Sequence, residues 1–335
     1  MTQTTSSSSP KVLVFGTGGV GCIYGWIVHK GGADVTAVCR TNYEAVKKSG
    51  ITIRSAIFGH QHYSPTTVNT VSEAAQHGPF DFILVASKAF SETAQLIKDA
   101  VSEQTCIVLA QNGIGIEDDY IKAYPNNPLL SGVIWLPATQ VSPGVVEMGP
   151  LETFEIGTYP ADGGPAAKAR AQQFSDLYSK AGATCPVYDD IQTKRWPKLA
   201  LNFAFNPVTA LTRCDDGNFL RSSPIADDII VDTMRQCGIV ARAAGYDVTE
   251  EYIQNVMGRH RDRMHSGGKQ PSMLVDIEND RAIEVEAILG NTLRLAQKHN
   301  IADQVPYIQL LYALAKGLNF SVVKGDEWKP ILKIS

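Results

Sequence analysis

The sequence lacks the features that mark several large classes of protein. Its six cysteines form no C-x-x-C pair and no cluster with histidine, so neither a disulfide framework nor a zinc site is expected. It contains no apolar run near the roughly 20 residues of a membrane-spanning helix. Basic residues are not in excess, because 30 Lys and Arg stand against 34 Asp and Glu. These absences predict a cytoplasmic protein that holds no metal and binds neither membrane nor nucleic acid.

The composition that is present is typical of a folded protein, with 44% hydrophobic and 19% charged residues. At about 150 residues per domain, a chain of 335 residues is expected to form two domains. Residues 1–10 are polar and lack the apolar segment of a secretory signal, so we expect a short disordered tail there.

The first half of the chain alternates short apolar runs with helical patterns. Runs rich in β-branched residues predict strands over residues 11–15, 34–39, 80–86 and 105–110. Helices are expected from Gly19 to about Lys30 and within 88–104, which predicts a parallel sheet with helices on both faces. Residues 51–57 and 63–68 are expected to form an extra hairpin. Antiparallel strands are expected at one edge over 132–137, 144–148 and 153–156.

The second half shows no strand-like alternation. Helices are predicted over residues 166–182, 190–205, 226–244, 272–299 and 305–318. The chain is therefore expected to be an α/β dinucleotide-binding domain over 11–185, followed by an all-helical domain over 186–335.

A glycine-rich turn follows the first predicted strand. Residues Gly16, Thr17, Gly18, Gly19, Val20 and Gly21 match G-x-G-x-x-G between a strand and a helix, the context that a dinucleotide site needs. Gly16 permits the tight turn, Gly18 lets the backbone approach a pyrophosphate, and Gly21 allows the helix to pack on the strand. The alternative is a glycine turn without a ligand.

The end of the second predicted strand indicates the cofactor. NAD enzymes usually carry Asp or Glu there, whereas this chain has Arg40, 19 residues after Gly21. A guanidinium can pair with a 2′-phosphate that a carboxylate would repel, so NADP(H) is predicted. A solvated surface arginine is the alternative.

Polar side chains also follow the third and fourth predicted strands. Lys88 and Asn112 stand just after these strands, where ligands bind in open α/β sheets. Lys88 can contact ribose or phosphate, and Asn112 can bond both cofactor and substrate. Both could equally be connecting residues.

In the second half, Lys198, Asn202 and Asn206 stand at helical spacing and share one face among large apolar residues. Polar groups in such surroundings need partners. Pro207 cannot donate a hydrogen bond to the carbonyl of Phe203, so we expect a kink or helix end that turns Asn206 toward a cleft. An ordinary polar stripe is the alternative.

The predicted helix over 272–299 offers further candidates. Ser272 begins it, and Asp276, Asp280 and Glu284 are expected to step along one face. Glu284 on a partly apolar stripe is a candidate buried acid. The alternatives are an N-cap for Ser272 and a surface pair of Glu284 with Arg281.

Taken together, the segments GTGGVG, SKA, QNG, KLALNFAFNPVTAL and PSMLVDIENDRAIEVEAILG resemble the ketopantoate reductase (2-dehydropantoate 2-reductase) family, from about residue 11 to 316. The resemblance implies a Rossmann domain joined to an all-α domain of the 6-phosphogluconate dehydrogenase C-terminal type. It implies NADPH-dependent reduction of a 2-oxo acid between the domains, as in pantothenate biosynthesis.

The resemblance also implies residue roles. Lys198 is similar to the catalytic general acid, and Glu284 to the acid that supports catalysis. Asn202, Asn206 and Ser272 are similar to substrate-binding residues. Asn112 is similar to the asparagine near the nicotinamide, and Arg40 and Lys88 to an NADP-binding pair. A cation that can donate a proton suits the charge that develops on a ketone oxygen.

One position departs from the family pattern. Asp216 stands where the family commonly carries a substrate asparagine, and its charge would oppose an anionic 2-oxo acid unless Arg213 or another cation offset it. The substrate could therefore be another branched 2-oxo acid, such as 2-ketoisovalerate. A non-enzymatic NADPH sensor is the other alternative. The helical half could supply a homodimer interface, although no pattern establishes one.

Overall fold

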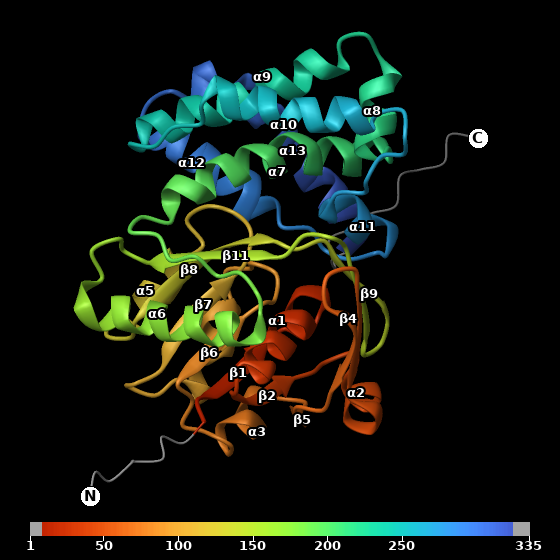
Figure 1. The fold of residues 1–335 in the computed structure, drawn as a ribbon. Coiled ribbons are helices and arrows are strands. Elements are labelled where there is room, and N and C mark those ends of the chain that lie inside the picture. Colours follow the sequence, from red (N-terminus) through yellow and green to blue (C-terminus); the bar gives the residue numbers. More distant parts are fainter. Residues whose placement is uncertain (1–8, 324–335) are drawn as a thin grey trace, which may run out of the picture. The chain divides into compact units, whose positions relative to one another are not determined.

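The computed structural model describes residues 9–323, so most of the predicted N-terminal tail lies outside the described residues. Its contacts divide the chain into two compact units (Figure 1). The α/β unit runs up to Asn112 and includes Ile116–Ile191. The helical unit joins Gly113–Gly115 to the chain from Gln192 onward. This division falls a few residues after the predicted boundary at 185, and it assigns a short internal segment to the helical unit.

The α/β unit is built on a seven-stranded sheet in the order β11-β8-β7-β6-β1-β2-β5. Its strands are β1 (Lys11–Phe15), β2 (Asp34–Val38), β5 (Thr66–Val68), β6 (Phe82–Val85), β7 (Cys106–Ala110), β8 (Leu129–Trp135) and β11 (Thr153–Thr158). All neighbours pair in parallel except β11, which runs antiparallel to β8. The predicted Rossmann-type sheet is confirmed, and its order reverses beside β1, where such sheets bind ligands.

The helices of this unit are α1 (Gly19–Lys30), α2 (Tyr43–Ser49), α3 (Val71–Ala75), α4 (Thr93–Leu96), α5 (Asp118–Ala123) and α6 (Gly164–Ala181). α1 and α6 pack side by side through buried aromatic rings. Tyr24 of α1 lies 4.7 Å from Phe154 of β11 and 5.6 Å from Tyr178 of α6, between ring centroids. Each such buried ring contributes roughly 1.5–3 kcal/mol.

The helical pattern over residues 88–104 produces much less helix than expected. Only α4 and a 3₁₀ turn over Lys98–Ala100 form there. The chain instead turns tightly after β6, because the carbonyl of Lys88 accepts hydrogen bonds from the Phe90 amide and the Thr93 hydroxyl.

A second sheet in the α/β unit corrects the predicted hairpin. It has the order β4-β3-β10-β9, with β3 (Ile51–Ser55), β4 (Gly59–Tyr63), β9 (Ala138–Ser142) and β10 (Val145–Met148). β3 pairs with β4, which includes only Tyr63 of the predicted partner segment 63–68. The turn between them forms because the Ser55 hydroxyl accepts hydrogen bonds from the Ile57 and Phe58 amides and Gly59 has φ +72°. β5 pairs with β2 instead, and β10 lies parallel to β3, away from the main sheet.

The described part of the helical unit contains α7 (Gln192–Thr212), α8 (Asp216–Ser222), α9 (Ala226–Ala243), α10 (Glu250–Arg263), α11 (Ser272–Glu278), α12 (Asn291–Lys298) and α13 (Pro306–Val323). α7 packs against α9, α11 and α13 (Figure 1). The side chains of its Trp196 and Phe203 are fully buried. An all-helical second half is confirmed, although α8 and α10 were not predicted.

Of the kink or helix end expected at Pro207, the helix end is wrong. α7 continues to Thr212 with both Pro197 and Pro207 inside it. A proline inside a helix costs about 3 kcal/mol, but the apolar side chains around it are buried. The Thr209 hydroxyl donates 2.8 Å to the Phe205 carbonyl and adds one hydrogen bond in the next turn.

The predicted continuous helix over 272–299 is also wrong. α11 ends at Glu278, Asp280 has φ +51°, and a π-helical turn over Glu286–Gly290 leads into α12. Asp276, Asp280 and Glu284 therefore do not share one helix face. Tertiary contacts explain the break, because Arg281 bonds back to Asp276 and the Ile283 amide donates to Asn319 of α13.

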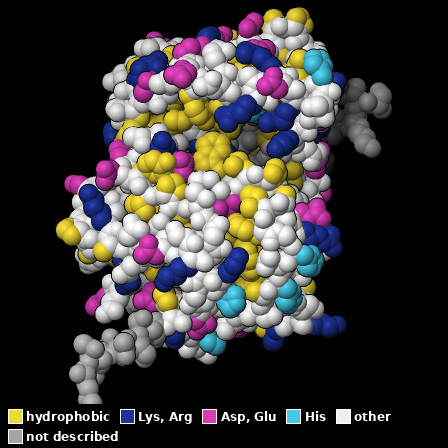
Figure 2. Space-filling view, viewed as in Figure 1, with side chains coloured by type: hydrophobic (Ala, Val, Ile, Leu, Met, Phe, Trp, Pro, Cys, Tyr) yellow, Lys and Arg dark blue, Asp and Glu magenta, His cyan; other side chains and the backbone are white. Residues whose placement is uncertain are grey.

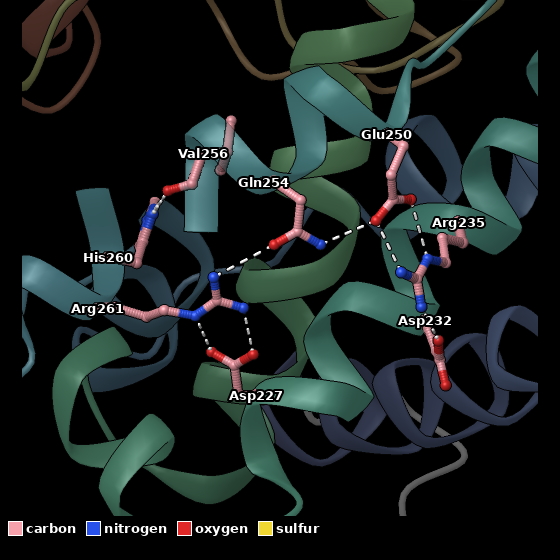
Figure 3. A network of polar contacts seen from close by, with 8 residues as sticks. All are labelled: Asp227, Asp232, Arg235, Glu250, Gln254, Val256, His260 and Arg261. Carbon is pink, nitrogen blue, oxygen red and sulfur yellow. Dashed lines mark hydrogen bonds and ion pairs between the residues drawn. The ribbon is translucent and has the colours of Figure 1, made fainter. Parts of the chain in front are cut away.

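An ion-pair network joins α9 to α10 on the surface (Figure 3). Arg261 pairs with Asp227 at 2.5 and 2.7 Å, and Arg235 pairs with Glu250 at 2.7 and 3.0 Å. Gln254 lies between the two pairs and bonds to both. The hydrogen bonds from Arg235 and Gln254 hold the pKa of Glu250 at about 2, below its ordinary 4.5.

Charged side chains of both signs are interspersed over the face shown in Figure 2. None of the helices among residues 9–323 combines the length and the apolar composition needed to cross a membrane. Those residues also hold no group of three or more His, Cys, Asp or Glu side chains that could bind a metal ion.

The lowered pKa of Glu250 makes the α9–α10 network sensitive to acid. Its contribution is complete above pH 4.5 and is lost as the pH falls toward 2. The side chains of Arg235 and Glu250 are 50% and 53% exposed, so solvent screening limits the contribution to roughly 1 kcal/mol or less. Glu250→Gln should therefore lower the free energy of unfolding slightly at pH 7, by urea denaturation, and the difference should shrink toward pH 3.

The same substitution at the next exposed carboxylate, Glu251→Gln, provides the control. A difference between wild type and Glu250→Gln that stays constant from pH 7 to pH 3 would contradict this account.

Candidate functional site

The glycine-rich turn between β1 and α1 requires glycine for steric reasons. Gly16 has φ +99°, and a Cβ atom there would lie 2.4 Å from the backbone nitrogen of Ser87. A Cβ at Gly21 would lie 1.9 Å from the carbonyl oxygen of Gly16. Side chains at these two positions would force the β1 turn away from the β6 loop and from α1, as the fingerprint predicts.

Gly18 differs, because a Cβ atom there would meet nothing within 4 Å. It is the N-cap of α1, and no side chain caps that helix end. The first amides of a helix carry no intrahelical partner and attract anions. The turn thus leaves open space beside backbone donors, which fits the pyrophosphate of a dinucleotide.

Arg40 lies at the second predicted cofactor position. It is exposed, two residues beyond the end of β2, in the turn that leads to α2. Asn42, which sequence reasoning did not select, is buried in the same turn and bonds to Thr17 of the glycine-rich turn.

Lys88 and Asn112 follow the neighbouring parallel strands β6 and β7, and both are partly buried. Gln111 bridges these two strand ends, because its amide donates to the carbonyls of Ser87 at 3.0 Å and Lys88 at 3.1 Å. The buried Tyr120 hydroxyl donates to Gln111 at 3.2 Å. Gln111 therefore fixes the backbone that carries Lys88, a function that only the tertiary contacts reveal.

In the helical unit, Lys198, Asn202 and Asn206 lie on successive turns of α7, as predicted. Lys198 is partly buried, and the two asparagines are 9% and 4% exposed. The Asn206 amide donates 3.2 Å to the hydroxyl of Ser272, the exposed first residue of α11. Two predicted substrate residues from distant parts of the sequence thus meet directly.

Glu284 lies in the irregular segment before the π-helical turn and is 8% exposed. Its buried position agrees with the prediction, although no continuous helix carries it. The next elements hold the internal segment Gly113–Gly115, since the Ile114 amide donates to the Ala287 carbonyl at 2.9 Å and Asn291 donates to the Ile114 carbonyl at 2.6 Å. Gly113 has φ +109°, and a Cβ there would lie 2.5 Å from the Ala287 carbonyl oxygen.

Arg195 of α7 also holds this segment, donating 3.0 Å to the Gly113 carbonyl. Sequence analysis missed both Arg195 and Asn291. The Asn-Gly dipeptide was the available signal, and its glycine is needed for a close backbone approach and not for a simple connecting turn.

Asp216 is 3% exposed and accepts a hydrogen bond from Arg263 at 2.9 Å and one from the Lys269 amide at 2.6 Å. Of the two alternatives, Arg213 or another cation, the second holds, because Arg263 of α10 offsets the charge of Asp216. His260 lies 3.4 Å from the same carboxylate and stacks on Phe205 of α7, with ring centroids 4.3 Å apart. Burial lowers the pKa of His260, so its imidazole is neutral at pH 7. The charge of the Asp216 carboxylate is then balanced by Arg263.

The contrast between Gly18 and Gly21 gives a direct test. Gly18→Ala should leave thermal stability unchanged, because its φ of −78° suits alanine and its surroundings are open. It should weaken NADPH binding about tenfold or more, measured by fluorescence titration, because the new methyl occupies the approach to the backbone amides. Gly21→Ala should lower stability by about 1–3 kcal/mol, because backbone must shift to admit its Cβ.

Each variant controls for the other, since the same methyl group is added three residues apart. Unaltered NADPH binding by Gly18→Ala would show that no ligand approaches this turn.

Comparison with known proteins assigns both units. The family model described as ketopantoate reductase PanE/ApbA matches residues 12–161, and the model of its C-terminal part matches residues 190–319. The 2-dehydropantoate 2-reductase of Nostoc sp. is 26% identical over 92% of this chain and 95% of its own length. An uncharacterized protein of Saccharomyces cerevisiae is 29% identical over 96% of both chains.

Solved structures agree with this assignment. The crystal structure of 2-dehydropantoate 2-reductase from Methylococcus capsulatus matches with a TM-score of 0.82 and 30% identity, over 95% of this chain and all of that one. D-mandelate dehydrogenase, solved with NADH and anilino(oxo)acetate, has the same fold at 21% identity, with a TM-score of 0.81 and coverage of 93% and 99%. The chain belongs to the ketopantoate reductase family, whose members are oxidoreductases of the 2-dehydropantoate 2-reductase type.

Proposed function

We propose that this protein reduces a 2-oxo acid to a 2-hydroxy acid with NADPH, and that its substrate is 2-dehydropantoate, which becomes (R)-pantoate for pantothenate biosynthesis. The observation that carries the proposal is the polar row on α7, with Lys198, Asn202 and Asn206 on successive turns and Asn206 bonded to Ser272. A lysine beside amide and hydroxyl donors suits an anionic substrate whose carbonyl must receive a proton.

In this proposal the nicotinamide cofactor, when bound, supplies the hydride that adds to the substrate carbonyl carbon. Lys198 donates the proton to the carbonyl oxygen and stabilises the negative charge that develops on it. Asn202, Asn206 and Ser272 bind the substrate through their amide and hydroxyl groups, and Asn112 contacts cofactor and substrate. Glu284, which is 8% exposed, supports substrate binding and catalysis.

NADPH is proposed over NADH because of the charge after β2. Arg40 is exposed there, and Asp34, the carboxylate of β2, lies at the opposite end of that strand. A guanidinium favours a 2′-phosphate through bidentate hydrogen bonds. Lys88, after β6, would contact the cofactor ribose or phosphate.

Asp216 favours a second candidate substrate. An ionised carboxylate only accepts hydrogen bonds, so Asp216 cannot offer the amide donor that the family asparagine would provide. Its oxygens accept from Arg263 and the Lys269 amide instead. A 2-oxo acid with fewer polar groups than 2-dehydropantoate, such as 2-ketoisovalerate, would need no such donor.

The six cysteines form no disulfide among the described residues, which supports a cytoplasmic location as part of this proposal.

The test is NADPH oxidation followed by absorbance against 2-dehydropantoate, 2-ketoisovalerate, pyruvate, oxaloacetate and larger branched 2-oxo acids. We expect 2-dehydropantoate to give the highest kcat/KM. Lys198→Ala should lower kcat by about 10²–10⁴-fold, because the proton donor is lost. A panel without turnover would reject the 2-oxo acid reductase, and equal turnover by Lys198→Ala would reject the role of Lys198.

Replacing Arg40 should separate the two cofactors. Arg40→Asp should raise the KM for NADPH by about ten- to a hundredfold, because a charge-assisted pair is lost and a repulsion is added, and should leave the KM for NADH nearly unchanged. Steady-state kinetics with both cofactors measures this. An equal rise in the KM for NADPH and for NADH would contradict the proposed recognition of the 2′-phosphate by Arg40.

Two interpretations of Asp216 predict opposite changes in the KM for the 2-oxo acid when this residue is replaced. If the carboxylate holds Arg263 and the loop before Ser272, Asp216→Asn should lower stability by about 1–3 kcal/mol and raise the KM for the 2-oxo acid. If it faces and repels the substrate, the same variant should lower that KM at unchanged stability. We expect the first result. Asp215→Asn is the matched control, since asparagine can keep the N-cap that Asp215 provides to α8.

A further inference from the structure

One backbone carbonyl in the glycine-rich turn accepts three hydrogen bonds. The Thr17 carbonyl oxygen lies 2.9 Å from the side-chain amide nitrogen of Asn42 and 2.9 Å from that of Gln140. The Cys22 thiol is its third donor, at 3.3 Å. These donors come from the turn before α2, from β9 and from α1. Three separate parts of the α/β unit thus converge on a single peptide group.

The side chain of Thr17 strengthens the same connection. Its hydroxyl donates to the carbonyl of Val38, the last residue of β2, at 3.2 Å, and lies 3.2 Å from the Asn42 side-chain oxygen. Thr17 and Asn42 are 7% and 4% exposed. Both ends of the Asn42 amide group therefore face Thr17: its nitrogen donates to the Thr17 carbonyl, and its oxygen lies beside the Thr17 hydroxyl.

This arrangement fixes the direction of the next amide. In a trans peptide the C=O and the following N–H point in opposite directions. Because the Thr17 carbonyl is held by these three donors, the Gly18 N–H is directed away from them, on the residue where an added Cβ meets nothing within 4 Å. Strand β9 also covers this helix start, since a Cβ at Gly19 would lie 2.9 Å from the Ala138 carbonyl oxygen.

Asn42 is also tied to Arg40 through the backbone. The Tyr43 amide donates to the Arg40 carbonyl at 3.4 Å, and the Val46 amide donates to the Asn42 carbonyl at 3.0 Å. The exposed Arg40 thus lies in a short turn whose far end is anchored at Thr17. Gln140, by contrast, comes from β9, outside the Arg40 turn.

We propose that Asn42 is a positioning residue that couples two parts of the cofactor site, the pyrophosphate-binding turn and the Arg40 turn that recognises the 2′-phosphate. Gln140 positions the pyrophosphate-binding turn alone. The inference rests on the proposed use of NADPH for its second part. A side chain that served only to brace the fold would affect stability and not the pattern of ligand affinities.

Two cofactor fragments separate the subsites. ADP-ribose carries the pyrophosphate without a 2′-phosphate, and adenosine 2′-monophosphate carries the 2′-phosphate without a pyrophosphate. Their affinities for the full-length protein would be measured by competition against NADPH fluorescence, with thermal unfolding in parallel. Asn42→Asp and Gln140→Glu each replace one amide donor by an isosteric carboxylate, and Asn42→Ala removes the donor without adding charge.

Both Asn42 variants should bind each fragment about fivefold or more weakly than wild type, the effect of losing one buried hydrogen bond. Gln140→Glu should weaken ADP-ribose alone, and Arg40→Ala should weaken adenosine 2′-monophosphate alone. Asn126→Ala, at an exposed asparagine of the same unit, should change neither affinity.

Three results would overturn the coupling. Asn42 variants that lose stability but bind both fragments like wild type would reduce Asn42 to a structural brace, and variants that weaken only ADP-ribose would confine it to the glycine-rich turn. Wild type that binds ADP-ribose but not adenosine 2′-monophosphate would instead reject the NADPH preference, and the coupling with it. Turnover plays no part in these measurements, so they stand apart from the choice of 2-oxo acid.

Discussion

The close backbone approach at Gly16 is the constraint on which the α/β unit depends. At this point the turn after β1 lies against the loop after β6 and beneath the first turn of α1, with no room for a Cβ at Gly16 or Gly21. This contact sets the direction of α1, and α1 in turn carries Tyr24 into the aromatic cluster with α6. The same contact leaves the uncapped start of α1 beside open space at Gly18. Packing and the capacity to bind an anion therefore come from one arrangement of backbone.

The helical unit has a different constraint, because polar side chains lie on a helix that is mostly apolar and buried. α7 is buried along most of its length, yet it carries Lys198, Asn202 and Asn206 on one face. Burial of such groups is tolerated only where partners exist, and the bond from Asn206 to Ser272 is one of them. The two prolines inside α7 destabilise the helix. Because the buried apolar side chains around them offset this cost, the helix continues past both prolines and the polar row stays on one face.

Sequence patterns predicted the regular strands and helices well, but they predicted poorly where a helix is interrupted. Strand β1 and helix α9 were placed almost as the structure has them, because apolar periodicity and glycine punctuation are local signals. The break after Glu278 gave no such signal, since neither glycine nor proline occurs between it and Glu284. It depends on Arg281 folding back on Asp276 and on Asn319 of α13, which no local pattern reports. Pro207 misled for the complementary reason, because a local signal for a helix end was overridden by packing.

For the proposed site, the sequence by itself indicated the candidate residues: the three glycines, Arg40, the row on α7 and Glu284. Chemistry explains this, because tight turns, phosphate charge and proton transfer each restrict the side chains that can serve them. Only the tertiary structure decided what holds these residues in place. Asn42 and Gln140 bond to Thr17, Gln111 fixes the backbone of Lys88, and Arg263 takes up the charge of Asp216. These supporting residues are separated from their partners by up to 123 positions, and a hydrogen bond across such a distance exists only once the chain has folded.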